Sequence, residues 1–177
     1  FEIIDASGRT VLPAWCDSHT HSVFTGSRSD EYIDRIKGLS YQEIAKKGGG
    51  ILKSANQIQK ISKNDLFEES KKRIYNLIKQ GTGCIEIKSG YGLNYNSELK
   101  MLNVIKDLKE SLPIEIKSTF LGAHAFPKEL SKSEYFDLVI NKMLPDFASR
   151  SLMDYVDIFC EKNYFTVDDT EQLIKEA

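Results

Sequence analysis

Hydrophobic and polar residues follow two different patterns along the chain, and segments with one pattern alternate with segments with the other. Where apolar residues recur every three to four positions, they share one face and predict a helix. Short apolar runs bounded by glycine, serine or proline predict strands instead. The predicted helices cover residues 30–47, 65–80 and 97–110, one begins at Ser131 and is disturbed at Pro145, and another begins at Thr166; the predicted strands cover residues 84–88, 114–121 and 155–160.

Polar residues and glycine mark the ends of several predicted helices. Ser62 or Asn64 can cap the start of the helix over residues 65–80, and Gly81 can adopt the left-handed conformation after it. Ser131, with Glu134 three residues later, has the pattern of a capping box. The ends of these helices are therefore specified locally.

Strands that alternate with helices imply a parallel sheet, because parallel neighbours need a crossover connection. The fold class is therefore α/β, and this pattern alone leaves open a doubly wound sheet and a (β/α) barrel. Residues 1–12 differ, since two short apolar runs flank the turn-prone residues 5–8 and predict a hairpin of a separate β element. We therefore place a domain boundary near Pro13.

The composition narrows the class of protein. Of the 177 residues, 41% are hydrophobic and 28% are charged, and the formal net charge is -2. These values are typical of globular domains, and the charges form no basic stripe of the kind that nucleic-acid binding needs. No apolar stretch approaches the length of about 18 residues that spans a membrane, and the first residues lack a signal-peptide pattern. We expect no nucleic-acid or membrane partner and a cytoplasmic location.

Three cysteines, Cys16, Cys84 and Cys160, lie far apart in the sequence. An odd number without CxxC spacing argues against a disulfide framework and against a thiolate metal site. Two of the three lie within apolar runs. The sequence therefore predicts buried free thiols in a reducing compartment.

Two of the three histidines form the motif His19-Thr20-His21 at the expected end of a strand. Side chains at positions i and i+2 of a strand point to the same face, so the two imidazoles can converge on one metal ion. Imidazole is a common ligand of zinc and also suits iron. A catalytic zinc needs about three protein ligands and a water. For the motif taken alone, a pair of exposed or hydrogen-bonded histidines is therefore the favoured interpretation.

Longer motifs surround the histidine pair. Residues 17–21 (DSHTH), introduced by residues 11–13 (VLP), resemble the first-strand signature of the metal-dependent amidohydrolases. Within that superfamily the chain resembles the imidazolonepropionases, in motifs that follow in the same order over nearly the whole chain. These motifs are GSR at 26–28 with DE at 30–31, GGGI at 48–51, EIKSGYGL at 86–93, ELKML at 98–102, TFLGAHA at 119–125 and FCE at 159–161. The chain departs from the family at residues 13–16 and Ser18, which are packing positions beside the histidines.

The resemblance implies an architecture and a metal site. It implies a TIM-like (β/α) barrel, of which residues 13–177 supply about the first four strands, preceded by a remnant of a β-sandwich domain at residues 1–12. A complete barrel of this kind has about 250 residues. The resemblance also implies that His19 and His21 bind one Zn or Fe ion. A third histidine, an aspartate ligand and the general acid/base are expected beyond residue 177.

The same resemblance assigns Arg28, Tyr91 and His124 to the binding of 4-imidazolone-5-propanoate. A guanidinium can bind a carboxylate through two parallel hydrogen bonds, and Tyr91 and His124 follow strands, where a barrel carries its active site. Without the family, Arg28 is a surface arginine paired with Asp30 or Glu31. Tyr91 is then an aromatic packed over a turn, and His124 is a hydrogen-bonded core histidine or a metal ligand.

Two further charged residues lie at strand ends. Some amidohydrolases carry a carboxylated lysine between two metals, but the imidazolonepropionase pattern assigns no such role to Lys88. We therefore expect Lys88 to be structural and ion-paired. Glu161 is expected to orient a neighbour in the site.

The resemblance implies metal-assisted hydrolysis of the ring amide of 4-imidazolone-5-propanoate to N-formimidoyl-L-glutamate, a step of histidine degradation. Two alternatives remain open: another cyclic amidohydrolase or deaminase of the superfamily, and a non-catalytic α/β module that binds a partner or a metal through its histidines. Half a barrel exposes a strand edge and an apolar face, so we expect it to pair with something or to aggregate, and a homodimer is one such pairing. Alone, the chain is expected to show no hydrolase activity and only weak metal binding.

Overall fold

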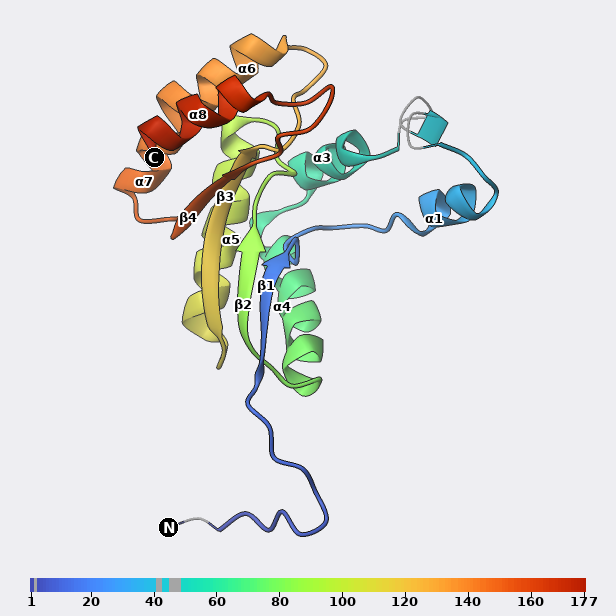
Figure 1. Ribbon diagram of the computed structural model, residues 1–177, viewed down its shortest axis with the longest axis vertical. Helices are drawn as coiled ribbons and strands as arrows, with labels where there is room; N and C mark the ends of the chain where they lie inside the picture. Colours follow the sequence, from blue (N-terminus) through green and yellow to red (C-terminus); the bar gives the residue numbers. More distant parts are fainter. Residues whose placement is uncertain (2, 41–42, 45–48) are drawn as a thin grey trace.

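The computed structural model describes residues 1, 3–40, 43–44 and 49–177. Four parallel strands lie side by side in the order β1-β2-β3-β4 and curl into half of a barrel (Figure 1). These strands are β1 (Trp15–Thr20), β2 (Thr82–Lys88), β3 (Glu115–Ala123) and β4 (Tyr155–Ile158). The predicted α/β class and the predicted partial barrel are confirmed.

Helices connect the strands and cover one face of the sheet. Helices α4 and α5 pack along this face, whereas α1 lies away from the sheet (Figure 1). None of the helices in the described part of the chain is long and apolar enough to cross a membrane. The helices are α1 (Ser29–Ile36), α3 (Ile51–Lys60), α4 (Lys63–Lys79), α5 (Tyr95–Ser111), α6 (Lys132–Leu138), the π-helix η1 (Val139–Met143), α7 (Leu144–Ser149) and α8 (Val167–Glu176).

The alternation of apolar and charged residues in β2 separates the two faces of the sheet. Ile85 and Ile87 are fully buried in the same hydrophobic core as Ile105 of α5. Burial of a side chain of this size stabilises a protein by about 1.5–3 kcal/mol relative to exposure. Glu86 and Lys88 point to the concave face, where they line a cavity of about 360 Å3. The interior of the half barrel is therefore charged.

Most of the predicted helix ends are present. Ser62 caps α4, and the capping box at Ser131 opens α6. Gly81, which follows α4, has a φ of 99°, the left-handed conformation predicted for it. Helix α5 begins at Tyr95, two residues earlier than predicted, because the side chain of Asn94 accepts a hydrogen bond from the first turn.

The helix predicted over residues 30–47 is shorter in the structure. It corresponds to α1, which ends at Ile36. Gly38, with a φ of 91°, adopts a left-handed conformation that stops a helix. Residues 41–42 and 45–48, on which part of this prediction falls, lie outside the described residues.

The N-terminal segment does not form the predicted hairpin. Residues 1 and 3–12 contain a turn, in which Arg9 N donates to Ala6 O at 3.0 Å, but no strand. Their apolar side chains are exposed, Ile3 by 92% and Val11 by 79%. A two-stranded ribbon that packs on nothing is marginal in water, so an extended segment replaces the hairpin (Figure 1). The domain boundary near Pro13 and the β-sandwich remnant stay predictions.

The prediction of buried cysteines is wrong, although the thiols are free. Cys16 and Cys160 are exposed, and Cys84 is half-buried. Cys16 and Cys84 are partners in the β1–β2 ladder and both line the concave face. Apolar neighbours in sequence did not bury them, because no described segment covers that face.

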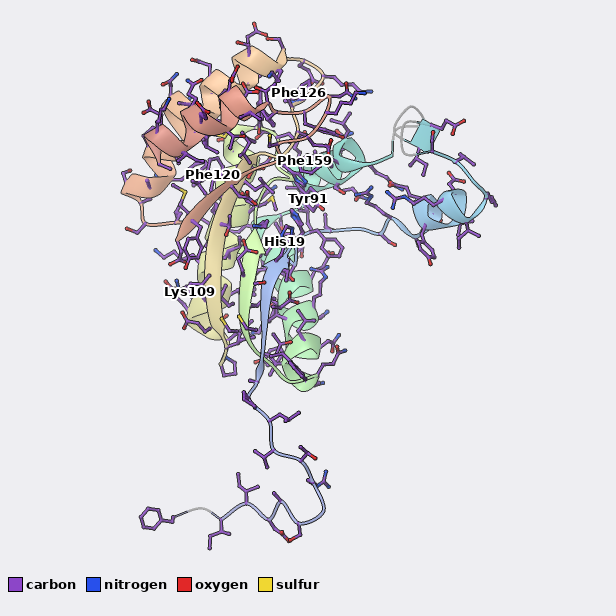
Figure 2. The ribbon with its side chains drawn as sticks, in the orientation of Figure 1. His19, Tyr91, Lys109, Phe120, Phe126 and Phe159 are labelled. Carbon is purple, nitrogen blue, oxygen red and sulfur yellow. The ribbon has the colours of Figure 1, made fainter. Side chains whose placement is uncertain are left out.

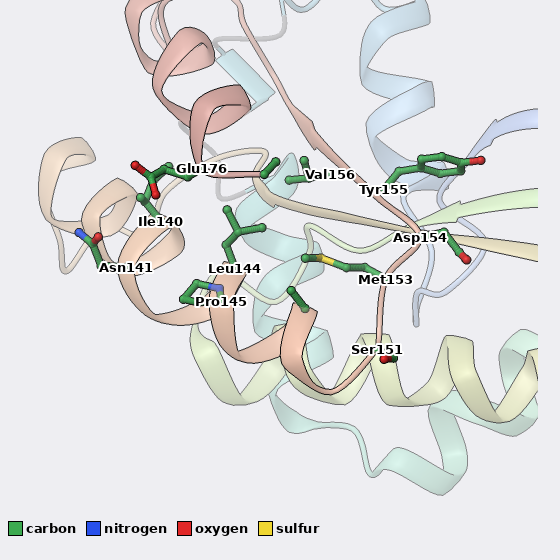
Figure 3. A pocket seen from close by; sticks show the side chains of 12 residues that line it. Ile140, Asn141, Leu144, Pro145, Ser151, Met153, Asp154, Tyr155, Val156 and Glu176 are labelled. Atoms are coloured by element: carbon green, nitrogen blue, oxygen red, sulfur yellow. The ribbon is translucent and has the colours of Figure 1, made fainter.

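The sheet has two open edges within the described residues, since β1 and β4 each pair with one strand. Beside β4, a cavity of about 690 Å3 lies between the sheet, η1, α7 and the end of α8 (Figure 3). Ile140, Leu144, Met153 and Val156 form much of its apolar lining. None of the predicted site residues lines it, so this cavity is separate from the candidate site.

Candidate metal and substrate site

The predicted site residues lie at the carboxyl ends of the strands, where parallel β/α folds carry their active sites. His19 lies in β1 and His21 directly follows it. Tyr91 follows β2, and His124 follows β3. Figure 2 shows His19 and Tyr91 at this end of the sheet.

The ring of His21 is the centre of an aromatic cluster. It stacks on Tyr91 with a centroid separation of 4.9 Å and on His124 at 5.0 Å. The His19 ring lies 5.9 Å from it, at an interplanar angle of 65°. Four predicted residues, contributed by three strands, are therefore brought together.

The imidazole of His21 is half-buried and has one ring nitrogen without a partner among the described residues. Burial lowers the pKa of His21 to about 4, and the nearby charges of His124, His19 and Lys88 act in the same direction. The imidazole is therefore neutral near pH 7, the form that binds metal ions. Its Nδ1 is buried and has no hydrogen-bond partner among the described residues. Buried polar atoms are nearly always satisfied, so this nitrogen is free for a ligand.

The two imidazoles fit the sharing of one metal ion. A Zn–N bond of about 2.0–2.1 Å places a ring centroid roughly 3 Å from the ion, so two ligating rings have centroids up to roughly 6 Å apart. The separation of 5.9 Å between His19 and His21 lies within this limit. In the described part of the chain, no group of three or more His, Cys, Asp or Glu side chains could hold an ion. A metal ion held by this pair would need further ligands.

His124 is held in one tautomer. Its Nδ1 lies 3.1 Å from the carbonyl oxygen of Gly90, which can only accept, so Nδ1 carries the hydrogen. Burial lowers the pKa of His124, and the ring is neutral near pH 7. The ring of Phe159 meets it edge-on at 5.6 Å. Nε2 of His124 is therefore a hydrogen-bond acceptor.

Arg28 pairs with Glu31, as expected for this arginine when it is considered without the family. Its Nε and Nη2 lie 2.8 and 2.7 Å from Oε2 of Glu31. The other oxygen of Glu31 accepts from Gly50 N at 3.1 Å. Arg28 also lines a cavity of about 800 Å3 together with Tyr91 and His124. This volume lies in the range of small-molecule sites, about 300–1,000 Å3.

A charged network supports the histidine pair from the concave face. Thr20, between the two histidines, donates its N–H to Oε2 of Glu86 at 3.2 Å and its hydroxyl to the Glu86 carbonyl at 2.8 Å. Lys88 Nζ lies 2.8 Å from Glu86 Oε1 and 3.0 Å from Asp157 Oδ2. Burial acts to lower the pKa of Lys88, but the hydrogen bonds to Glu86 and Asp157 outweigh it and raise the pKa. The expected ion-paired, structural Lys88 is present.

Known proteins similar to this chain include several imidazolonepropionases. The imidazolonepropionase of Flavobacterium johnsoniae is 55% identical over 175 residues, and that of Flavobacterium psychrophilum is 53% identical over 176. The imidazolonepropionase of Alkaliphilus oremlandii is 42% identical over 177 residues. The chain is a homologue of imidazolonepropionases.

The matches cover 98–99% of this chain but 42–43% of each imidazolonepropionase. The chain therefore spans less than half the length of the curated relatives it matches. No family model matches the chain.

Sequence reasoning missed two residues that support the site in this imidazolonepropionase homologue. Glu86 holds Thr20 between the histidines, and Glu98 accepts hydrogen bonds from the loop that carries Tyr91. Both lie within the motifs that resemble the family, yet a glutamate in a sequence indicates a solvated surface by default. Glu86 lies between two core isoleucines of a strand, and this position was a signal that its carboxylate needed a partner.

Proposed function

We propose that this chain provides the metal-binding and substrate-binding part of an imidazolonepropionase. The reaction adds water across the ring amide of 4-imidazolone-5-propanoate, breaks the C–N bond and gives N-formimidoyl-L-glutamate. One observation carries the proposal: the rings of His21, Tyr91 and His124 all contact one another, and His19 lies beside His21, at the carboxyl ends of the strands. The similarity to known imidazolonepropionases supports the same reaction.

In this proposal His19 and His21 hold a Zn or Fe ion together with ligands from outside the described residues. When bound, such an ion polarises a carbonyl and lowers the pKa of water towards about 7. The orphaned Nδ1 of His21 and the low pKa of this imidazole fit that role. Glu86 keeps the two rings in register through Thr20.

The remaining residues bind and orient the substrate. Arg28 binds the propionate carboxylate through the edge of its guanidinium that Glu31 leaves free. His124 accepts a hydrogen bond from a ring N–H of the substrate through Nε2, because its Nδ1 is engaged by Gly90. The Tyr91 hydroxyl donates to a polar group of the substrate.

Arg28→Ala in the whole protein that carries this chain tests the anchoring role. Loss of a charge-assisted bidentate contact of about 1.5–3 kcal/mol raises KM for 4-imidazolone-5-propanoate by about 10- to 150-fold with a smaller change in kcat. Arg28→Lys keeps the charge without the planar fork and recovers part of the loss. An unchanged KM in Arg28→Ala would show that the arginine serves only its pair with Glu31.

Two other measurements separate the proposal from its alternatives. A substrate profile that favours another cyclic amide or an exocyclic amine would assign the protein to a different amidohydrolase or to a deaminase. A whole protein that binds no stoichiometric metal would instead be a non-catalytic module. In the same proposal we place the protein in the cytoplasm, and a homodimer stays a prediction.

A further inference from the structure

Glu98 is a buried acid whose hydrogen bonds all go to one loop. It lies in the first turn of α5 and is 0% exposed. Its carboxylate accepts from the backbone N–H groups of Gly90 at 3.0 Å, Gly92 at 2.6 Å and Leu93 at 3.2 Å. No basic side chain in the described part of the chain forms an ion pair with it. Backbone N–H groups therefore stand where a buried carboxylate ordinarily has a cation, and they oppose the rise that burial causes in the pKa of Glu98.

These bonds fix the peptide groups around Tyr91. The N–H of Gly90 belongs to the peptide between Ser89 and Gly90. The N–H of Gly92 belongs to the peptide between Tyr91 and Gly92. The peptide between Gly90 and Tyr91 is held through its carbonyl oxygen, Gly90 O, which lies 3.1 Å from Nδ1 of His124. Three consecutive peptides are thus held, and the Tyr91 side chain starts from a fixed backbone.

Two glycines allow the loop to lie this close to its neighbours. Gly90 has a φ of 100°, and a Cβ there would lie 2.7 Å from Leu121 O and 3.1 Å from the His124 side chain. A Cβ at Gly92 would lie 2.4 Å from the backbone nitrogen of Glu98. Any larger residue would push the loop off the carboxylate. The sequence SGYGL is therefore matched to Glu98 five residues further on.

We infer that Glu98 is a positioning residue for substrate binding. Its carboxylate sets Tyr91 over the His21 ring and, through the Gly90 peptide, sets the orientation of the His124 ring. The inference rests on the proposed function for the roles of Tyr91 and His124, but the geometry it describes does not. An acid in the first turn of a helix also stabilises that helix, and the experiment must separate the two effects.

Glu98→Gln in the whole protein is the test, with Glu134→Gln as its matched control. The glutamine replaces one acceptor oxygen with a donor that faces the loop N–H groups. Glu134 also accepts bonds near a helix start, from Ser131, but it is exposed and belongs to α6. Glu98→Gln should raise KM for 4-imidazolone-5-propanoate by about tenfold or more. Glu134→Gln should leave KM unchanged, although both variants lose helix stability.

A second readout reports the loop without catalysis. In Glu98→Gln the amides of Gly90, Gly92 and Leu93 should exchange hydrogen faster, and the imidazole resonances of His124 should shift. Glu98→Asp, which keeps the charge on a shorter side chain, should give intermediate values of KM and exchange, and it carries the same readouts if the glutamine variant does not fold.

The outcomes distinguish the inference from the proposed function. Faster exchange, shifted His124 resonances and a raised KM in Glu98→Gln support the inference. An unchanged KM in a variant with a loosened loop overturns it and leaves Glu98 a helix-stabilising residue. If the wild-type protein does not turn over the substrate, the proposed function fails. The His124 resonances then decide alone, and their invariance overturns the inference.

Discussion

The end of β1 and the loop after β2 each carry part of the candidate site, but they are held in different ways. Strand β1 has one neighbour among the described residues, and its pairing with β2 shifts register between Asp17 and Thr20. Its Trp15 is 62% exposed. The loop over residues 89–93 instead lies between β3 and α5, and most of it is buried.

Each segment is supported by a buried carboxylate, and the two carboxylates are neutralised differently. Glu86 supports β1 and is paired with Lys88, which is paired in turn with Asp157. Glu98 supports the loop and accepts from three of its backbone N–H groups, without a basic partner among the described residues. An ion pair tolerates small movements, whereas three N–H groups converging on one carboxylate demand one backbone conformation. The end of β1 that carries the two histidines is therefore held by charge, and the loop that carries Tyr91 is held by geometry.

Glu86→Ala is expected to have the largest effect on stability. It leaves Lys88 buried with one partner and removes the acceptor of Thr20 N. Breaking a buried pair by removal of one member costs about 3–5 kcal/mol. Urea unfolding would measure the loss, and Glu115→Ala, which breaks the exposed pair with Lys117, should cost about 1 kcal/mol or less. Similar losses in the two variants would show that charge does not hold the β1 end.

Gly90→Ala tests whether the loop is held by geometry. The added Cβ meets Leu121 O, and the residue must keep a φ of 100°, so we expect a loss of about 2–3 kcal/mol. Gly38→Ala is a matched control, because its φ is 91° but its Cβ would meet nothing within 4 Å. The control should lose about 1 kcal/mol, the cost of the left-handed conformation alone. Equal losses would contradict tight packing of the loop.

Thr20→Val is expected to have the smallest effect. It keeps the shape and the backbone bond to Glu86, but it removes the hydroxyl that donates to the Glu86 carbonyl and accepts from Ser22. The free energy of unfolding should fall by about 1 kcal/mol, the net value of a part-buried hydrogen bond. Urea unfolding at fixed pH measures it. A loss as large as that of Glu86→Ala would mean that the hydroxyl, rather than the ion pair, aligns β1.

The sequence predicted the regular part of the fold because its signals are local. The caps at Ser62, Ser131 and Thr166 specify where helices start, and the disturbance expected at Pro145 corresponds to the π-helix just before it. The hairpin over residues 1–12 failed because strands need a face to pack on, which local sequence does not reveal. The helix predicted over residues 30–47 ends early, because Gly38 adopts a left-handed conformation that stops it.

From the sequence pattern, only those residues of the candidate site that lie at or after strand ends could be predicted to come together. His19 lies near the end of a strand, and His21, Tyr91 and His124 follow strands, so parallel packing brings them together. The supporting glutamates escaped prediction, because which face of a strand or helix turns inward depends on the whole sheet. A family resemblance named the residues of the site, and the structure adds how they are held.

Helix α6 and its continuation bury residues at intervals of four: Tyr135, Val139, Met143 and Phe147. An ideal α-helix has 3.6 residues per turn, so each such interval rotates the buried side by about 40°. The wider turn of η1 takes up one additional residue, and this cancels most of the rotation that the successive intervals add up to. If η1 were a regular α-helix with the same number of residues, Phe147 would turn by roughly 100° away from Phe120, on which its ring now packs at 5.2 Å. The bulge thus keeps the second half of this helix in phase with the sheet.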